Sequence, residues 1–104
     1  MNVWTPTINP DAKLPIMVWI HGGSLQNSNG NWPTYSPTGK LAMDTHIVYV
    51  SMNYRLHAFG FMALDILSQN SQTNTSGNFG FMDQQLAMRW VQKNIRNFGG
   101  IQTW

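Results

Sequence analysis

The sequence predicts an α/β fold, in which helices cover a largely parallel sheet. Two apolar runs of strand length, LPIMVWI at 14–20 and IVYVSM at 47–52, are separated by more than twenty residues. A helix-period pattern follows from residue 82. The order of strand, crossover, strand, long loop and amphipathic helix is typical of an open α/β sheet.

The two predicted strands, 14–20 and 47–52, are continuously apolar rather than alternating. Continuous hydrophobicity is typical of strands that are covered on both faces, as in parallel sheets flanked by helices. The segment between them is long enough for a right-handed crossover between parallel neighbours. We expect a short helix at 40–44 within this crossover.

An amphipathic helix is predicted over 83–98, because apolar residues recur there every three or four positions. They are Met82, Leu86, Ala87, Trp90, Val91, Ile95 and Phe98. Asp83 would then lie in the first turn, where a negative charge suits the helix dipole. Gly99 and Gly100 fit a C-cap. The polar segments 26–31 and 68–78 are expected to be loops.

Composition argues against several functional classes. The chain has no cysteine, and His46 and His57 have no partner at metal-ligand spacing, so no metal site is expected. The net charge of +2 comes from four Asp and no Glu rather than from many basic residues, and no nucleic-acid partner is expected. Arg89, Lys93 and Arg96 are interpreted as a solvated helix face, with a phosphate-facing stripe as the alternative.

No membrane segment is expected in this chain. No apolar run approaches the roughly 20 residues that span a bilayer. Residues 1–10 also lack the charged and apolar regions of a signal peptide.

The stretch His21-Gly22-Gly23-Ser24 directly follows the first predicted strand. Glycines permit backbone angles at which N–H groups converge on one point, as in an oxyanion hole. Such a hole stabilises the negative oxygen of a tetrahedral acyl-transfer intermediate. An ordinary glycine turn at a strand end is the alternative. Ser24 is not expected to be a nucleophile, because it lacks a G-x-S-x-G elbow.

Three stretches occur in a specific order: HGGS at 21–24, SMNYRLHAFGF at 51–61 and SGNFGFMDQQLAMRWVQKNIRNFGG at 76–100. Together they resemble the carboxylesterase/cholinesterase family, the type B carboxylesterases, from NVWTP at 2–6 through Gly100. The resemblance implies a fragment of an α/β-hydrolase fold, with the end of one strand at 2–4, two further strands, and the helix that precedes the nucleophile strand. Residues 1–100 would be a partial domain from the N-terminal half, before the nucleophile elbow, and 101–104 an off-pattern tail.

The family's glycine-rich loop is usually HGGG, and its second and third glycines donate the oxyanion-hole N–H groups. By position, the resemblance implies that Gly23 and Ser24 are these donors and that His21 and Gly22 shape the loop. Ser24 departs from the commonest pattern. A serine would be strained if the loop requires a positive φ there.

Arg55 and Asp83 match two positions that form a buried ion pair in the family. The resemblance therefore implies a structural role for this pair. Removing one partner of a buried pair typically costs about 3–5 kcal/mol. Trp19, Trp32 and Tyr35 are candidates to line a substrate gorge, although aromatic residues in strands more often belong to the core.

The resemblance implies a serine carboxylic-ester hydrolase that needs no cofactor and meets its ester substrate in a full-length parent. The chain contains no serine elbow and no recognisable acid and histidine partners, so the isolated chain is expected to be inactive. The alternative is a scaffold fragment of a neuroligin-like, non-catalytic adhesion protein with a protein partner, since HGGS also occurs in that branch. If the protein is located as is typical of the family, it would be secreted or at the cell surface.

The family continues FGGDP where this chain reads FGGIQTW. This difference predicts a fragment, arising from a truncated gene model, a splice product or a pseudogene-like remnant. A fragment of the sheet leaves strand edges that pair with other chains. We therefore expect the chain expressed alone to aggregate or to fold only partly, whereas a sharp two-state melt of a soluble monomer would contradict this.

Overall fold

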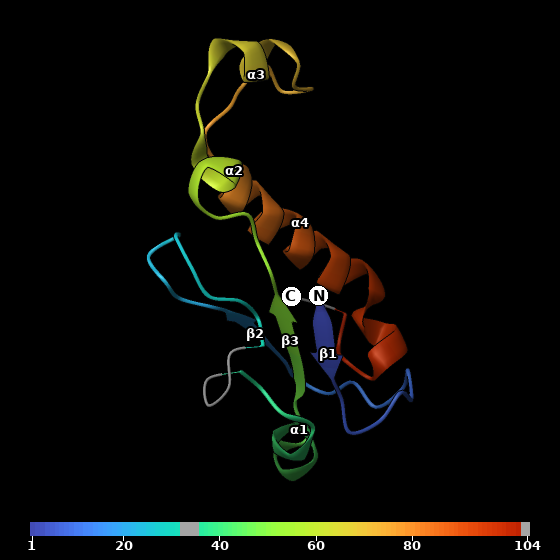
Figure 1. Cartoon of the computed structure of the whole chain (residues 1–104). Helices are drawn as coiled ribbons and strands as arrows, with labels where there is room; N and C mark the ends of the chain where they lie inside the picture. Colours follow the sequence, from blue (N-terminus) through green and yellow to red (C-terminus); the bar gives the residue numbers. More distant parts are fainter. Residues whose placement is uncertain (32–35, 103–104) are drawn as a thin grey trace.

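The computed structural model describes residues 1–31 and 36–102, and it shows a small sheet with one long helix packed against it and shorter helices beyond the ends of the sheet (Figure 1). Its strands are β1 (Asn2–Trp4), β2 (Ile16–Ile20) and β3 (Val48–Met52). Its helices are α1 (Gly39–Thr45), α2 (His57–Phe61), α3 (Asp65–Gln69) and α4 (Phe79–Asn94), which continues as the 3-10 helix η1 (Ile95–Phe98). The predicted α/β architecture is confirmed.

The sheet has the order β1-β3-β2, so the last of the described strands lies in the middle. β2 and β3 run parallel, with Val18 opposite Val50, whereas β1 runs antiparallel to β3. The sheet is therefore mixed. The crossover between β2 and β3 contains α1, close to the helix predicted at 40–44, and the Thr38 side chain caps it by accepting a hydrogen bond from the Leu41 N–H (3.2 Å).

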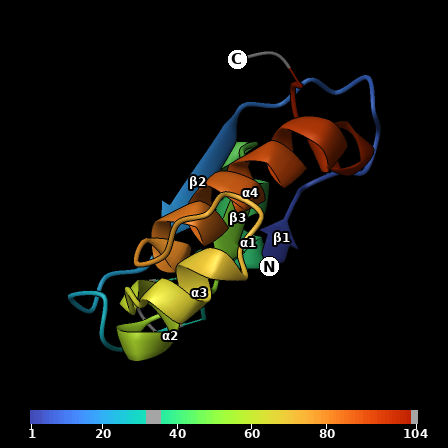
Figure 2. The ribbon, with the colours of Figure 1, turned by 90° about the horizontal axis from the view of Figure 1, so that it is seen from above.

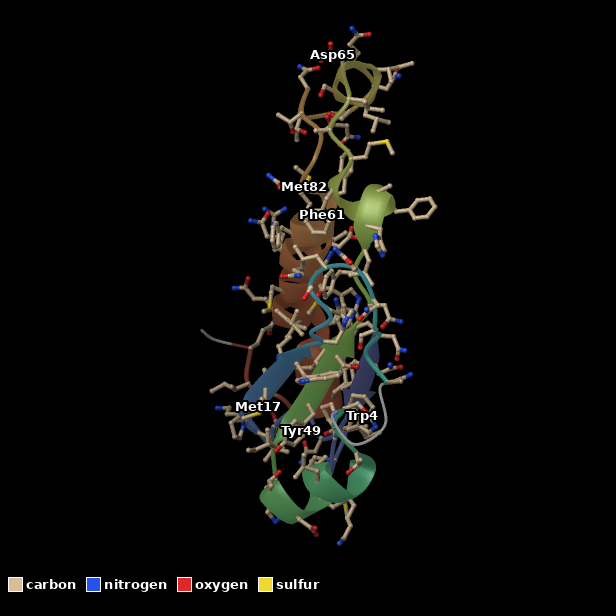
Figure 3. The ribbon with its side chains drawn as sticks, turned by 60° about the vertical axis from the view of Figure 1, so that its left-hand side comes forward. Trp4, Met17, Tyr49, Phe61, Asp65 and Met82 are labelled. Carbon is tan, nitrogen blue, oxygen red and sulfur yellow. The ribbon has the colours of Figure 1, made fainter. Side chains whose placement is uncertain are left out.

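β3 fits the prediction of a strand covered on both faces, because all five of its residues are buried. The same prediction is wrong for β2. Ile16 and Val18 pack against the core, but Met17 on the opposite face is 52% exposed. Figure 3 shows Met17 at the outer part of the sheet, beyond Tyr49 of β3. An apolar run predicts burial only where other elements cover it, and β2 is an outer strand of the described sheet.

Helix α4 covers one face of the sheet (Figure 2). Val91 and Ile95 pack on Val48 and Val50 in one buried cluster. A second cluster contains Met52, Tyr54 and Ala87. Part of the predicted apolar stripe is not used, since Leu86 is 64% exposed. The core is therefore narrower than the sequence pattern suggests.

Helix α4 begins at Phe79, four residues before its predicted start at 83, and its first turn contains no acidic residue. The assignment of Asp83 to the first turn is therefore wrong. Close packing explains the earlier start. A Cβ on Gly80 would lie 2.6 Å from the Arg55 carbonyl oxygen and 2.6 Å from the Phe61 ring, so a glycine lets this turn approach the segment after β3.

The end of η1 matches the predicted glycine cap, because Gly99 has φ +80°. The chain then pairs with Leu14, two residues before β2. The Leu14 N–H donates to the Gly99 carbonyl (2.9 Å), and the Ile101 N–H donates to the Leu14 carbonyl (2.8 Å), which forms an isolated parallel bridge between Leu14 and Gly100. Residues 103 and 104 of the predicted tail lie outside the described residues.

Helices α2 and α3 form an arm that extends beyond the sheet, with Asp65 near its far end (Figure 3). The predicted loop at 68–78 is wrong for its first two residues, which end α3. Each of these helices has only five residues. Segments this short do not develop a recognisable helical period.

Candidate functional site

The segments that follow β2 and β3 lie together, because the two strands are parallel and end at the same side of the sheet. We call residues 21–25 the glycine loop and residues 53–57 the post-β3 segment. In open α/β sheets, binding sites form at the carboxyl ends of the strands. The candidate oxyanion residues therefore occupy the expected place.

The glycine loop has an unusual backbone. Three consecutive residues have positive φ: Gly23 at +117°, Ser24 at +53° and Leu25 at +62°. The Gly23 carbonyl accepts hydrogen bonds from the N–H groups of Gln26 (3.0 Å) and Asn27 (3.2 Å). Within the described residues, the N–H groups of Gly23 and Ser24 donate to no protein acceptor. Two successive amides are thus available to an acceptor from outside the chain.

Ser24 has a positive φ of +53°. It stands where the family's HGGG loop has glycine, so the strain expected for a serine at this position is present. A left-handed conformation costs an L-residue roughly 1–2 kcal/mol, whereas glycine adopts it freely. We expect Ser24→Gly to raise the free energy of unfolding by about 1 kcal/mol, measured by urea titration of a full-length parent that contains this segment. Gln26→Gly, at an exposed neighbour without a positive φ, should instead be slightly destabilising. A Ser24→Gly variant that is less stable than the unaltered protein would contradict the inference that Ser24 is strained.

His21 begins the glycine loop and is nearly fully buried, at 2% exposure. Its carbonyl accepts a hydrogen bond from the Tyr54 hydroxyl (2.8 Å), and its ring stacks on the Tyr54 ring with centroids 4.5 Å apart. Its Nδ1 lies 2.9 Å from the Gly22 carbonyl oxygen. Because a carbonyl only accepts, Nδ1 carries the proton in this contact.

The other end of the glycine loop is also tied to the post-β3 segment, since the His57 N–H donates to the Leu25 carbonyl (2.9 Å). Burial raises the pKa of the Tyr54 phenol, which keeps its hydroxyl protonated as a donor. The loop is therefore held at residue 21 and at residue 25, and the N–H groups of interest lie between these two attachments.

Arg55 and Asp83 form a bidentate pair. The Arg55 Nε donates to Asp83 Oδ2 (2.8 Å), its Nη2 donates to Oδ1 (2.8 Å), and its backbone N–H also donates to Oδ2 (2.9 Å). The guanidinium lies 5.1 Å from the centroid of the Phe79 ring. These contacts attach the post-β3 segment to α4.

The expectation that this ion pair is buried is wrong. The Arg55 side chain is 50% exposed and the Asp83 side chain 25% exposed. The pair borders an open groove of about 430 Å³ that is also lined by Met52, Ala87 and Trp90. A partly hydrated pair stabilises the fold less than a buried one. Removing one partner should therefore cost less stability than it would in a buried pair.

The pair predicts how stability depends on pH. Hydrogen bonds from the Arg55 side chain lower the pKa of Asp83, against the opposing effect of partial burial. A depressed aspartate pKa contributes stability that is complete above the unfolded value of about 3.9 and is lost as the pH falls through the folded value. We expect Asp83→Asn to cost about 1 kcal/mol at pH 7, and this difference to shrink below about pH 4.

The measurement is urea unfolding, at a series of pH values, of a full-length parent that contains this segment. Asp11→Asn is the matched control, because the Arg96–Asp11 pair is long, at 3.6 Å, and highly exposed. It should change the free energy of unfolding very little at any pH. A cost of Asp83→Asn that stays constant from neutral to acid pH would show that the pair does not carry the effect.

His46 and Trp19 are further candidates from the sequence that the structure describes. His46 ends α1 in a left-handed conformation, and no group of three or more possible metal ligands occurs in the part of the chain that the structure describes. Trp19 lies near His21, with ring centroids 6.5 Å apart. Trp32 and Tyr35 lie outside the described residues.

Among residues 1–31 and 36–102, no helix combines the length and the hydropathy that crossing a membrane requires.

Sequence reasoning missed Tyr54, which contacts the glycine loop through both its hydroxyl and its ring. The stretch SMNYRLHAFGF drew attention only as a family resemblance. A tyrosine after a buried strand ordinarily suggests core packing, and nothing in the pattern indicates a hydroxyl that reaches a carbonyl 33 positions earlier.

Comparison with known proteins places these observations in a family. The family model for the carboxylesterase family matches residues 1–102. The chain is 39% identical over 100 residues to fumonisin B1 esterase of Sphingopyxis macrogoltabida, covering 96% of this chain and 18% of that protein. It is 44% identical over 101 residues to acetylcholinesterase of Electrophorus electricus, covering 96% of this chain and 15% of that protein. The chain thus spans less than a fifth of the length of these curated relatives.

Solved structures agree. The crystal structure of Geobacillus stearothermophilus carboxylesterase EST55 at pH 6.8 superposes with a TM-score of 0.81 at 38% sequence identity, covering 94% of this chain and 20% of that one. A thermophilic pNB esterase superposes with a TM-score of 0.72 at 42% identity, covering 92% and 18%. The predicted fragment of an α/β-hydrolase fold is confirmed. The strand order, the sequence matches and the superpositions lead to one conclusion: the chain belongs to the carboxylesterase family.

Proposed function

We propose that this chain supplies the oxyanion hole of a carboxylic-ester hydrolase, with the N–H groups of Gly23 and Ser24 as donors. One observation carries the proposal. Two consecutive amides at the end of a parallel strand donate to no acceptor within the described residues. Gly23 is partly exposed and Ser24 is exposed, so both N–H groups are open to water or to a ligand oxygen.

The proposed chemistry is acyl transfer. When a nucleophile attacks an ester carbonyl, negative charge develops on the carbonyl oxygen. Two fixed N–H donors stabilise that charge without reorganising, and removing one donor from such a hole typically slows turnover by about 10²–10³. His21 and Gly22 would shape the loop, and the Arg55–Asp83 pair would hold the post-β3 segment in place.

The 104 residues contain no G-x-S-x-G elbow. We therefore expect the isolated chain to hydrolyse no ester and to be unlabelled by a fluorophosphonate probe. In a full-length parent, a serine would attack the ester, and a histidine oriented by an acidic residue would move the proton. Labelling of the isolated chain at a single serine would contradict the expectation that the nucleophile lies outside these residues.

A transplant tests the function. Residues 1–100 would replace the matching segment of Geobacillus stearothermophilus carboxylesterase EST55, whose structure aligns with nearly all of this chain. If the glycine loop is competent, the transplant should hydrolyse a p-nitrophenyl ester with a kcat within roughly tenfold of the parent. A transplant that folds, as judged by a cooperative melt, but has no turnover would contradict the proposal and favour the non-catalytic scaffold.

A further inference from the structure

We propose that Tyr54 is a positioning residue for the oxyanion hole, acting through His21 to fix the direction of the Gly23 N–H. The inference rests on the proposed function. It follows from the rigidity of the peptide unit, in which a carbonyl and the next N–H lie in one plane and point in opposite directions. Whatever holds a carbonyl in the loop also aims the following amide.

Each proposed donor is aimed in this way. The N–H of Gly23 shares a peptide unit with the Gly22 carbonyl, which lies 2.9 Å from His21 Nδ1. The N–H of Ser24 shares a peptide unit with the Gly23 carbonyl, which is held by two N–H groups of the following turn. The second carbonyl is fixed by backbone alone. The first depends on the orientation of an imidazole ring.

Tyr54 sets that orientation. The two rings are stacked at an interplanar angle of 17°, and the Tyr54 hydroxyl holds the His21 carbonyl at 2.8 Å. Both residues are buried. One side chain therefore restrains the backbone and the ring of His21 together, and the ring in turn holds the Gly22 carbonyl. Removing the hydroxyl should loosen the first restraint, and removing the ring should loosen both.

The test uses the EST55 transplant, selectively labelled with ¹⁵N at glycine, histidine and valine, and compares three variants by NMR. Tyr54→Phe keeps the stacked ring and loses the hydroxyl. Tyr54→Leu loses both. Tyr49→Phe is the matched control, because Tyr49 is also buried and its hydroxyl lies 3.2 Å from Thr45 Oγ1, in a contact unrelated to the glycine loop.

In Tyr54→Phe we expect the amide resonances of Gly22 and Gly23 to shift, while those of Val91 in α4 stay in place. Hydrogen exchange at the His57 N–H, which donates to the Leu25 carbonyl, should accelerate roughly tenfold, the effect of losing one hydrogen bond of ordinary strength. Tyr54→Leu should also shift the His21 ring nitrogens. Tyr49→Phe should alter none of these signals.

Two outcomes would overturn the proposal. If the Gly22 and Gly23 resonances of both Tyr54 variants match those of the unaltered chain, Tyr54 does not position the loop. If exchange accelerates equally in α4 and in the loop, its role is general stability. Neither NMR readout requires an ester or a nucleophile. If the transplant is inactive but the Tyr54 variants still shift the loop resonances, the proposed function is contradicted and the positioning role of Tyr54 is not.

Discussion

Gly23→Ala is expected to lower the kcat of the EST55 transplant by at least about a hundredfold, the scale of losing one oxyanion donor. Gly23 has φ +117°, which L-residues rarely adopt. A Cβ at this position would overlap the Asn27 carbonyl oxygen and lie 2.9 Å from the Asn27 carbonyl carbon. The loop would have to change shape, which would move the Gly23 and Ser24 N–H groups. The measurement is steady-state hydrolysis of a p-nitrophenyl ester.

Gly39→Ala provides the control for this experiment. Gly39, at the start of α1, has no other atom within 4 Å of an added Cβ, and its φ lies outside the left-handed region. It should keep kcat within a few-fold of the unsubstituted transplant. A cooperative melt for both variants would separate loss of the donor from loss of the fold. Equal activity in the two variants would count against the oxyanion assignment.

Ile95→Ala should destabilise the EST55 transplant by about 2–5 kcal/mol, a large effect for a single substitution. Ile95 is fully buried and packs with Val48, Val50 and Val91 between η1 and the sheet. Truncation removes apolar contacts and leaves a cavity that the rigid sheet cannot close. Urea unfolding followed by tryptophan fluorescence gives the free energy directly.

Ile8→Ala is the matched substitution for this test, because Ile8 is one of the most exposed large apolar side chains of the described residues. Its effect should stay within about 0.5 kcal/mol. A cost below about 1 kcal/mol for Ile95→Ala would mean that the α4 face is not closely packed on the sheet.

The sequence predicted most elements of the fold, because periodicity and apolar runs are local signals. Two strands, the crossover helix and the amphipathic helix are all present near their predicted positions. The errors concern how elements cover one another. The runs at 14–20 and 47–52 look alike in sequence, yet only β3 has a neighbouring strand on each side within the described sheet. Helix α4 starts early because Gly80 fits against Arg55 and Phe61, a contact between distant segments.

The candidate site was predictable to a similar extent. The glycine loop was located from His21-Gly22-Gly23-Ser24 after a strand, and the pairing of Arg55 with Asp83 followed from the resemblance. The exposure of that pair and the contact between Tyr54 and His21 could not be predicted. Both depend on which side chains meet across 28 and 33 sequence positions, respectively.

The torsion angles of the glycine loop have a consequence for substitution studies. Both proposed donors belong to the main chain, and every amino acid except proline carries the same N–H. An alanine scan would therefore leave the chemistry at position 24 in place and would register only the altered torsional strain. The direction of these N–H groups depends on the backbone conformation of the loop. A one-residue insertion or deletion between positions 21 and 25 should therefore damage the proposed oxyanion hole far more than a change of side chain at Ser24.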